Sequence, residues 1–311
     1  MKYVITGGAG FIGSHIVEEL VKQAQEVVVI DNLYNTTKDK IKSSLKKIRF
    51  VKGDVRNLAL LKKEFKNADY VLHLAALISV TESVRKPEEY HEVNVGGTRN
   101  VLEAARLNNV KRVVFSSSCA VYGSTKTVPQ VENLEPMPMS PYAENKLEGE
   151  KLCKEYYEKH GLKTICLRYF NVFGPRQDPK SPYAGVISIF AQKLLDNVQP
   201  TIFGDGEQTR DYVFVKNVVQ ANLLACKAEK GFGEIFNIGT EKETSVNTIL
   251  KLLNKYLGKD AKPIYSPARE GEMSRACADC TKAKKTLGYK VTYSFEQGLK
   301  ENLEWIKQQN R

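Results

Sequence analysis

The 311-residue chain is predicted to belong to the α/β class, with a doubly wound parallel sheet and a smaller mixed α/β C-terminal lobe. Short apolar runs alternate with stretches of helical period through the first half, which is the order of parallel β-α units. The runs are apolar along their whole length, as expected for strands that helices cover on both faces. After Asn171 this order gives way to shorter elements.

Six strands and four helices are predicted from this pattern. The strands are expected at residues 3–6, 27–31, 48–54, 70–76, 112–118 and 164–170. The helices are expected at about residues 12–23, 57–66, 87–108 and 141–160. We therefore expect a first domain over residues 1–171 and a smaller lobe over residues 172–311. Segments of about 213–240 are expected to return from that lobe to the main sheet.

Composition and charge restrict the classes of protein that fit the chain. Hydrophobic residues make up 42% of it, and no apolar run approaches the roughly 18–20 residues that a membrane span needs. Because Met1 leads directly into the first strand, we expect no signal peptide, no membrane partner and a cytoplasmic location. The net charge of +11 suits an anionic small-molecule substrate.

A dense basic stretch runs from Lys38 to Arg49. It contains no interleaved aromatic residues on which nucleic-acid bases could stack. We therefore interpret it as a solvated helix face and expect no nucleic-acid partner.

The cysteines and histidines do not predict a metal site. The six cysteines are scattered, which indicates reduced thiols, and the pair Cys277 and Cys280 lacks a second pair or nearby His ligands. The four histidines have no metal-ligand spacing and receive no role: His15, His73, His91 and His160.

A glycine-rich loop between the first strand and the first helix predicts a dinucleotide site. In "TGGAGFIGSH", Gly7, Gly10 and Gly13 permit a tight turn and close approach of the backbone to a pyrophosphate. The helix N-terminus then offers free N–H groups and a partial positive charge to the anion. Asp31 ends the second strand 18 residues past Gly13, where a carboxylate binds ribose hydroxyls and repels a 2′-phosphate. The segment "DNLYNTT" supplies no Arg that would reverse this preference, so a Rossmann-type domain that binds NAD is predicted, with Asp54 touching the adenine.

A tyrosine and a lysine four positions apart in "SPYAENK" predict the catalytic centre. Ser140 fits a helix N-cap and Pro141 the first helical position, so Tyr142 and Lys146 share one face of a helix. An ammonium beside a phenol is expected to lower its pKa and make Tyr142 a general base. The same spacing occurs at three other places where no such helix start is predicted: Tyr34/Lys38, Tyr122/Lys126 and Tyr212/Lys216.

With these motifs the chain resembles the extended short-chain dehydrogenase/reductase family over nearly its whole length, and within it the UDP-sugar 4-epimerases. The motifs occur in the family's order: "TGGAGFIGSH", "FSSSCAVYG", "SPYAENK", "LRYFNVFGPRQDP", "IFGDGEQTRDYVFV", "NIGT" and "REGE". The resemblance implies a catalytic triad of Ser118, Tyr142 and Lys146. It also implies a homodimer through the helices at about 87–108 and 141–160.

The resemblance and the loop together give a set of expected site residues. The NAD site is expected to comprise Gly7, Gly10, Phe11, Ile12, Gly13, Asp31, Asn32, Asp54, Val55, Leu74, Ala75, Ala76, Asn94, Ser116, Tyr142, Lys146 and Tyr169. The UDP-sugar is expected to meet Ser118, Tyr142, Asn171, Val186, Arg210, Arg269, Glu272 and Ala276.

The implied reaction is a 4-epimerisation by transient oxidation at C4, in which Tyr142 takes the proton of the sugar O4. Two departures from the galactose-specific pattern bear on the substrate. Ile78 stands where many UDP-galactose epimerases carry a lysine, and "NVFGPRQDP" is more similar to the N-acetylhexosamine branch. Ala276 matches a position where galactose-specific relatives carry a bulky tyrosine, so UDP-GlcNAc and UDP-GalNAc are the expected pair.

Three alternatives are weighed against this hypothesis. A 4,6-dehydratase needs the Asp-Glu pair of "TDEVYG", where this chain has "SSSCAVYG". A UDP-glucose/UDP-galactose or UDP-hexuronate 4-epimerase stays open, with Arg275 as a candidate partner of a hexuronate carboxylate. A non-catalytic NAD-sensing or RNA-binding member of the fold usually lacks the Tyr/Lys pair, which this chain keeps.

Overall fold

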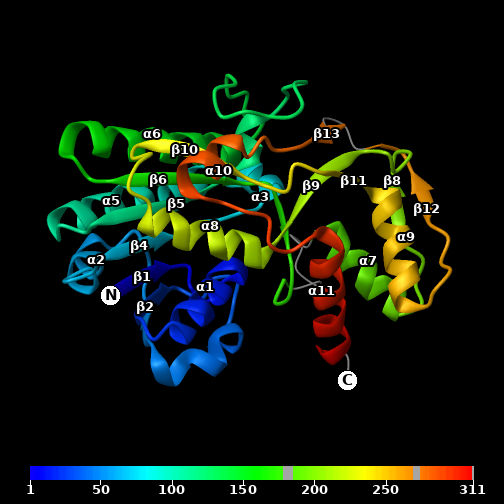
Figure 1. Ribbon diagram of the computed structural model, residues 1–311, viewed down its shortest axis with the longest axis horizontal. Helices are drawn as coiled ribbons and strands as arrows, with labels where there is room; N and C mark the ends of the chain where they lie inside the picture. Colours follow the sequence, from blue (N-terminus) through cyan, green and yellow to red (C-terminus); the bar gives the residue numbers. More distant parts are fainter. Residues whose placement is uncertain (178–184, 269–273, 310–311) are drawn as a thin grey trace.

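The computed structural model describes residues 1–177, 185–268 and 274–309. Within them, a seven-stranded parallel sheet has the strand order β10-β6-β5-β4-β1-β2-β3 (Figure 1). The bounds of its strands are β1 (Lys2–Thr6), β2 (Glu26–Asp31), β3 (Arg49–Lys52), β4 (Tyr70–His73), β5 (Arg112–Ser118), β6 (Thr164–Tyr169) and β10 (Glu234–Ile238). The order reverses beside β1, so the predicted doubly wound fold is confirmed.

Helices cover both faces of this sheet. One face carries α1 (Phe11–Lys22), the 3₁₀ helix η1 (Lys38–Lys47) and α8 (Val215–Lys227); the other carries α2 (Leu58–Glu64), α5 (Gly97–Leu107) and α6 (Pro141–His160). Successive strand residues enter different cores: Ile5 packs with Ile16 of α1, whereas Val4 packs with the residues of α2 and α5. Burial on both faces explains why the strands are apolar along their whole length.

Two predicted elements differ in detail from the observed ones. The strand expected at 70–76 ends at His73, so residues 74–76 form a loop at the edge of the sheet. The helix expected at 87–108 is divided into α4 (Pro87–His91), a π-helical turn (Glu92–Gly96) and α5, and α3 (Val80–Arg85) precedes it. Such π-helical turns often mark functional sites.

The smaller lobe has its own core between short strands and three helices. Its elements are β7 (Asn171–Phe173), α7 (Val186–Leu195), β8 (Thr201–Phe203), β9 (Thr209–Phe214), β11 (Glu243–Ser245), α9 (Val246–Leu257), β12 (Ile264–Ser266), β13 (Arg275–Ala276) and α11 (Phe295–Gln309). Phe190, Phe214, Leu253 and Leu303 belong to this core. The strand β9 is central, since β7, β11 and β13 all pair with it.

Two segments from the second half of the chain pack with the main sheet. The first contains α8 and β10, and β10 pairs with β6. The second contains α10 (Thr281–Leu287), whose Ala283 and Leu287 join the hydrophobic core beside β10. The pattern of the sequence did not predict this second return. Among the described residues, no helix is long and apolar enough to cross a membrane, and no cluster of His, Cys, Asp or Glu could hold a metal ion.

Candidate active site

A cavity of about 610 Å³ opens at the carboxyl ends of the parallel strands. This is the edge where ligands bind in doubly wound sheets. All the residues expected at the NAD site line it, apart from Asn94. The lining also includes residues that sequence reasoning missed: Ile30, Tyr34, Asn35, Thr36, Lys40, Gly53, Arg56, Leu77, Ile78, Glu89, Val93, Ser117 and Gln177.

The glycine loop is shaped for close approach of a ligand to the backbone. Gly7 has φ +73°, and a Cβ there would lie 2.6 Å from the backbone N of Ala75. A Cβ on Gly13 would lie 2.3 Å from the carbonyl oxygen of Gly7. No side chain caps α1 at Gly10, and the first residues of the helix, Gly10 to Gly13, line the cavity. The loop therefore fits a pyrophosphate, as predicted.

Asp31 lies at the end of β2 in the wall of the cavity. Its Oδ2 accepts a hydrogen bond from the Ala9 N–H (3.0 Å) and its Oδ1 one from the Leu33 N–H (2.9 Å). Burial raises the pKa of Asp31, while these two hydrogen bonds and the charge of Lys40 oppose the rise. The carboxylate is thus fixed relative to the glycine loop, where ribose hydroxyls are expected.

Asp54 lies at the same end of the cavity and is paired with a cation that the sequence did not suggest. Arg56 donates to both of its carboxylate oxygens at 2.9 Å, and Asn32 donates to Oδ2 at 3.0 Å. The Arg56 hydrogen bond lowers the pKa of Asp54 to about 2. From the segment "DNLYNTT", no arginine was expected near the ribose site. Arg56, from the loop after β3, nevertheless lines the cavity.

The other end of the cavity is formed by the start of α6. Ser140 caps this helix, because its Oγ accepts from the Ala143 N–H at 3.2 Å, and Pro141 occupies the first turn. Tyr142 and Lys146 both line the cavity, as predicted from their spacing. The Nζ of Lys146 donates to the carbonyl oxygen of Ser116 at 2.7 Å.

The expectation that Lys146 lowers the pKa of Tyr142 is wrong for the protein by itself. Burial raises the pKa of Tyr142 to about 12, and a hydrogen bond with Ser118 opposes this rise. The ammonium of Lys146 is directed at Ser116 and lies 6.0 Å from the centroid of the Tyr142 ring. Burial also lowers the pKa of Lys146 to about 8, while the charge of Glu150 opposes the fall.

The other tyrosines with a lysine four positions on lie in different surroundings. Tyr122 is fully buried and donates to Asn237 Oδ1 at 2.7 Å, and Tyr212 belongs to the core of the smaller lobe. Tyr34 lines the end of the cavity near Asp31 and is exposed to solvent. Position in the fold, therefore, distinguishes Tyr142 from the other three.

Polar residues behind the wall fix its geometry. Asn94, in the π-helical turn, lies one layer behind the cavity, where its side chain exchanges two hydrogen bonds with the backbone of Leu77 (2.8 and 2.9 Å). Tyr169 lies in the wall, 3.0 Å from Ser116 Oγ, and receives a 2.8 Å hydrogen bond from Asn222 of α8. Sequence reasoning missed Asn222, which lies 53 residues from its partner.

Three of the residues expected to bind the UDP-sugar, Asn171, Arg210 and Ala276, lie on the small sheet around β9. Asn171 pairs with Tyr212, and Ala276 pairs in register with Arg210. The charge of Arg210 acts on the thiol of Cys119, which follows Ser118, so this part of β9 lies near the catalytic end of the cavity. Arg269 and Glu272 lie outside the described residues.

The two remaining residues considered from the sequence begin α7 and β13. Val186 begins α7, whose Ser188 donates to Gln177 of the cavity wall at 3.2 Å. Arg275, the candidate partner of a hexuronate carboxylate, instead forms an ion pair with Glu243.

The chain is similar over its length to known enzymes. The NAD dependent epimerase/dehydratase family model matches residues 3–239. The chain is 44% identical over 310 residues to a putative UDP-glucose 4-epimerase from Methanocaldococcus jannaschii, with 99% of each chain covered. A UDP-glucose 4-epimerase from Thermotoga maritima, solved with UDP-glucose, has a TM-score of 0.95 at 40% identity, with 100% of both chains covered. A UDP-N-acetylglucosamine 4-epimerase from Methanobrevibacter ruminantium, solved with UDP-N-acetylmuramic acid, has a TM-score of 0.95 at 37% identity, covering 99% of this chain and 98% of that one.

These similarities and the site define the class of protein: an enzyme with a nicotinamide dinucleotide cofactor. The chain belongs to the NAD dependent epimerase/dehydratase family, so the resemblance to UDP-sugar 4-epimerases that its motifs predicted is confirmed. Its cofactor is NAD.

Proposed function

We propose that the protein interconverts UDP-N-acetylhexosamines, UDP-GlcNAc and UDP-GalNAc, by 4-epimerisation. The observation that carries the proposal is the position of Tyr142 and Lys146, together in the cavity wall beside Ser118 and facing the lobe that contains Arg210. Relatives that act on UDP-glucose and on UDP-N-acetylglucosamine are both similar to the chain, so family membership supports the reaction more strongly than the sugar.

Each residue at the catalytic end has a role that its surroundings support. Tyr142 takes the proton from the sugar O4 and returns it, while Ser118, its hydrogen-bond partner, holds the phenol in place or relays that proton. When bound, NAD supplies the hydride acceptor and a positive charge. Since burial keeps Tyr142 protonated in the protein alone, additional positive charge is required to make it a base. Lys146 binds the nicotinamide ribose.

The acetamido preference rests on Ala276. Its side chain is 1% exposed, and it lies opposite Arg210, the proposed ligand of the diphosphate. A methyl group at this position leaves more room at the sugar C2 than the tyrosine of galactose-specific relatives. The hexuronate alternative is less well supported, because the guanidinium of Arg275 is paired with Glu243.

The test is incubation of the purified protein with a panel of UDP-sugars and separation of the products. We expect interconversion of UDP-GlcNAc and UDP-GalNAc with the highest kcat/KM, slower turnover of UDP-glucose and UDP-galactose, and none of UDP-glucuronate. A higher kcat/KM for UDP-glucose would overturn the acetamido preference. The absence of turnover with every sugar by protein loaded with NAD would overturn the proposed reaction.

We also propose, from the family resemblance, that two copies pair through α4, α5 and α6. Their outer surfaces include exposed residues such as His91, Leu107 and Tyr157. Light scattering coupled to size exclusion is expected to give twice the chain mass of 35.0 kDa. A mass of one chain at micromolar concentration would contradict the proposal.

A further inference from the structure

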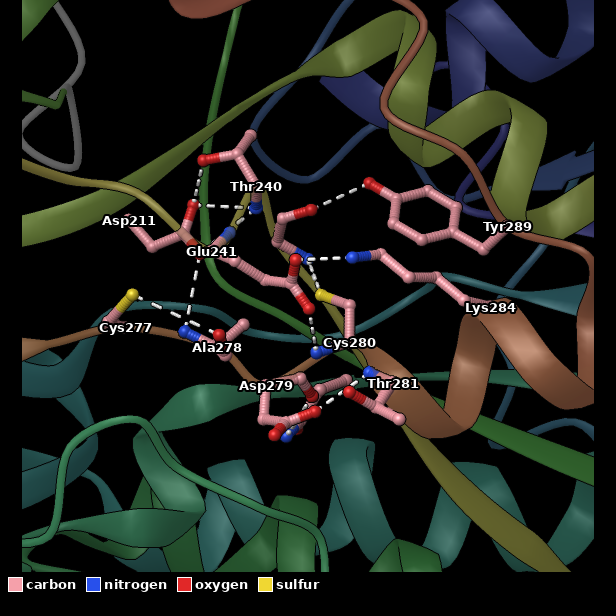
Figure 2. Close-up of polar contacts among 12 residues, drawn as sticks. Asp211, Thr240, Glu241, Cys277, Ala278, Asp279, Cys280, Thr281, Lys284 and Tyr289 are labelled. Carbon is pink, nitrogen blue, oxygen red and sulfur yellow. Dashed lines mark hydrogen bonds and ion pairs between the residues drawn. The ribbon is translucent and has the colours of Figure 1, made fainter.

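Asp211 is a fully buried carboxylate next to Arg210 in β9. Its oxygens accept hydrogen bonds from two separate segments (Figure 2). Thr240 donates from its N–H (2.8 Å to Oδ1) and from its Oγ1 (2.6 Å), and the N–H of Glu241 donates at 2.9 Å. The N–H of Ala278 donates to Oδ2 at 3.2 Å. One side chain thus contacts the residues after β10 of the main sheet and the residues after β13.

Further contacts fix the segments that Asp211 joins. Glu241 has φ +60°, and its Oε1 accepts from the Cys280 N–H at 3.0 Å. Tyr289 donates to the carbonyl oxygen of Gly239 at 2.8 Å, and the Gly239 N–H lies 3.3 Å from the Cys280 sulfur. A Cβ on Gly239 would lie 2.5 Å from Asp211 Oδ2, so the packing is close. Figure 2 shows Asp211 at one side of this cluster, with Cys277 and Ala278 beside it.

The strand that carries Ala276 is short, and contacts beyond its own ladder hold it: Gln130 forms backbone hydrogen bonds with Cys277 and Asp279 (2.8 Å each), and Asp211 bonds Ala278. β13 is two residues long, and its register with β9 has only two pairs, Arg275 with Thr209 and Ala276 with Arg210. So short a ladder has little stability of its own. The Asp211 bond to Ala278, two residues beyond Ala276, attaches the same segment to β9 a second time. Hydrogen bonds to a buried charge are about twice as strong as neutral ones.

We propose that Asp211 is a positioning residue that fixes the distance between Arg210 and Ala276, and thereby determines the selectivity of the site between acetamido and plain hexoses. The inference rests on the proposed function, which assigns Arg210 to the diphosphate and Ala276 to the sugar. Burial of the carboxylate raises its pKa, and the hydrogen bonds from Thr240, Ala278 and Glu241 oppose this rise.

Asp211→Asn tests the inference, because the amide keeps the shape but places an NH₂ group against N–H and O–H donors. Thr240→Val is a milder variant that removes one donor, and Thr240→Ser restores it. Asp205→Asn is the control, since Asp205 is an exposed residue of the same lobe whose side chain accepts from the Glu207 N–H within its own turn. All variants are prepared as holoenzymes and compared for bound NAD, kcat and KM with UDP-GlcNAc and UDP-glucose.

We expect Asp211→Asn to raise KM for UDP-GlcNAc about tenfold and to change KM for UDP-glucose little. The ratio of kcat/KM for UDP-GlcNAc to that for UDP-glucose should therefore fall about tenfold, with kcat changed less than threefold and NAD content unchanged. Thr240→Val should show a smaller change of the same kind, and Thr240→Ser should match the parent. An unchanged ratio in both Asp211→Asn and Thr240→Val would overturn the inference, and so would a loss confined to kcat. If Asp211→Asn does not fold, the two Thr240 variants decide by the same criterion.

Hydrogen exchange separates this inference from the proposed function. We expect faster exchange of the Ala278 and Glu241 amides in Asp211→Asn and weaker binding of UDP-GlcNAc in calorimetry, whether or not the parent turns it over. If the parent turns over no UDP-sugar, the proposed reaction fails while these two measurements still test the anchor. Parent-like exchange at both amides would overturn the anchor even in an active epimerase.

Discussion

The two ends of the active site are built in different ways. The cofactor end rests on β1, β2, β4 and β5, strands of four to seven residues inside one continuous parallel sheet. The proposed sugar end rests on β9, of six residues, and on the short strands that pair with it: β7 and β11, of three residues each, and β13, of two. Long main-chain ladders fix the first end, whereas short ladders and buried side chains such as Asp211 together fix the second. Substitutions at the two ends should therefore change different properties of the enzyme.

The largest effect is expected from Tyr142, which lies at the cofactor end of the active site. Tyr142→Phe removes the proposed base and little volume, so kcat should fall roughly 100- to 10,000-fold while UDP-sugar binding and NAD content stay near those of the parent. Tyr157→Phe is the control, because Tyr157 lies on the same helix with its ring against Phe232, outside the cavity. Steady-state kinetics and calorimetry with UDP-GlcNAc measure both quantities. Near-normal turnover by Tyr142→Phe would remove Tyr142 from the mechanism.

The difference between the two ends also explains what could be predicted from the sequence. The glycine loop and the Ser140 cap are local patterns, in which the residues that make a turn or a helix start are neighbours in the chain. The contact of Asp211 with Ala278 joins residues 67 positions apart, and that of Tyr169 with Asn222 joins residues 53 apart. Periodicity and spacing contain no information about such pairs, so these supports were missed.

The pKa of Tyr142 was missed for a related reason. The spacing correctly placed Lys146 on the same helix face, but the direction of its ammonium depends on the carbonyl of Ser116 at the end of β5, 30 residues away. The size of the desolvation effect on both groups also depends on the packed surroundings, which a spacing pattern does not describe.

The second prediction concerns a buried ion pair behind the catalytic end. Arg168 of β6 donates to both carboxylate oxygens of Glu150 (2.8 and 2.7 Å), and Ser117 donates to the same carboxylate at 2.6 Å. Arg168→Met leaves this buried carboxylate without its cation, so the free energy of unfolding should fall by roughly 3–5 kcal/mol.

The control is Lys154→Met, which breaks an exposed ion pair with Glu158 on the same helix as Glu150 and should change stability by less than about 1 kcal/mol. Urea denaturation of the two holoenzymes measures the difference. Equal urea midpoints in the two variants would show that the buried ion pair does not stabilise the protein more than the exposed one.

The third prediction applies to the sugar end alone. Ala276→Tyr places a ring at the pocket position proposed for the acetamido group, so kcat/KM for UDP-GlcNAc should fall at least about tenfold while that for UDP-glucose changes little. Bound NAD should be unchanged, because Ala276 is not among the residues that line the cofactor cavity. Product analysis with both sugars gives the ratio. Ser274→Tyr, which adds the same ring at an exposed position two residues earlier in the segment, is the matched control. An Ala276→Tyr variant that epimerised UDP-GlcNAc at the parent rate would place the pocket elsewhere.

The smallest effect is expected from titration of Lys146. Because burial lowers its pKa to about 8, its ammonium is charged below that pH and neutral above it, whereas an ordinary lysine titrates near 10.4. NAD carries a net negative charge, so the loss of this cation should weaken NAD binding as the pH rises through about 8. The carboxylate of Glu150 and the thiol of Cys153 act on the same ammonium, and its charge in turn acts on buried His73. Since burial lowers the pKa of His73 to about 3, His73 stays neutral across this range.

When NAD is titrated into the cofactor-free protein, we expect its dissociation constant to rise by less than about tenfold between pH 7 and 9. Lys146→Met should bind NAD more weakly at pH 7 and show no dependence over this range, because the titrating group is gone. Lys151→Met, an exposed lysine of the same helix, should keep the slope of the parent. Calorimetric titrations at four or five pH values give all three curves. The same slope in Lys146→Met as in the parent would mean that another group at the cofactor end titrates, and the charge of Lys146 would then have no part in the pH dependence of NAD binding.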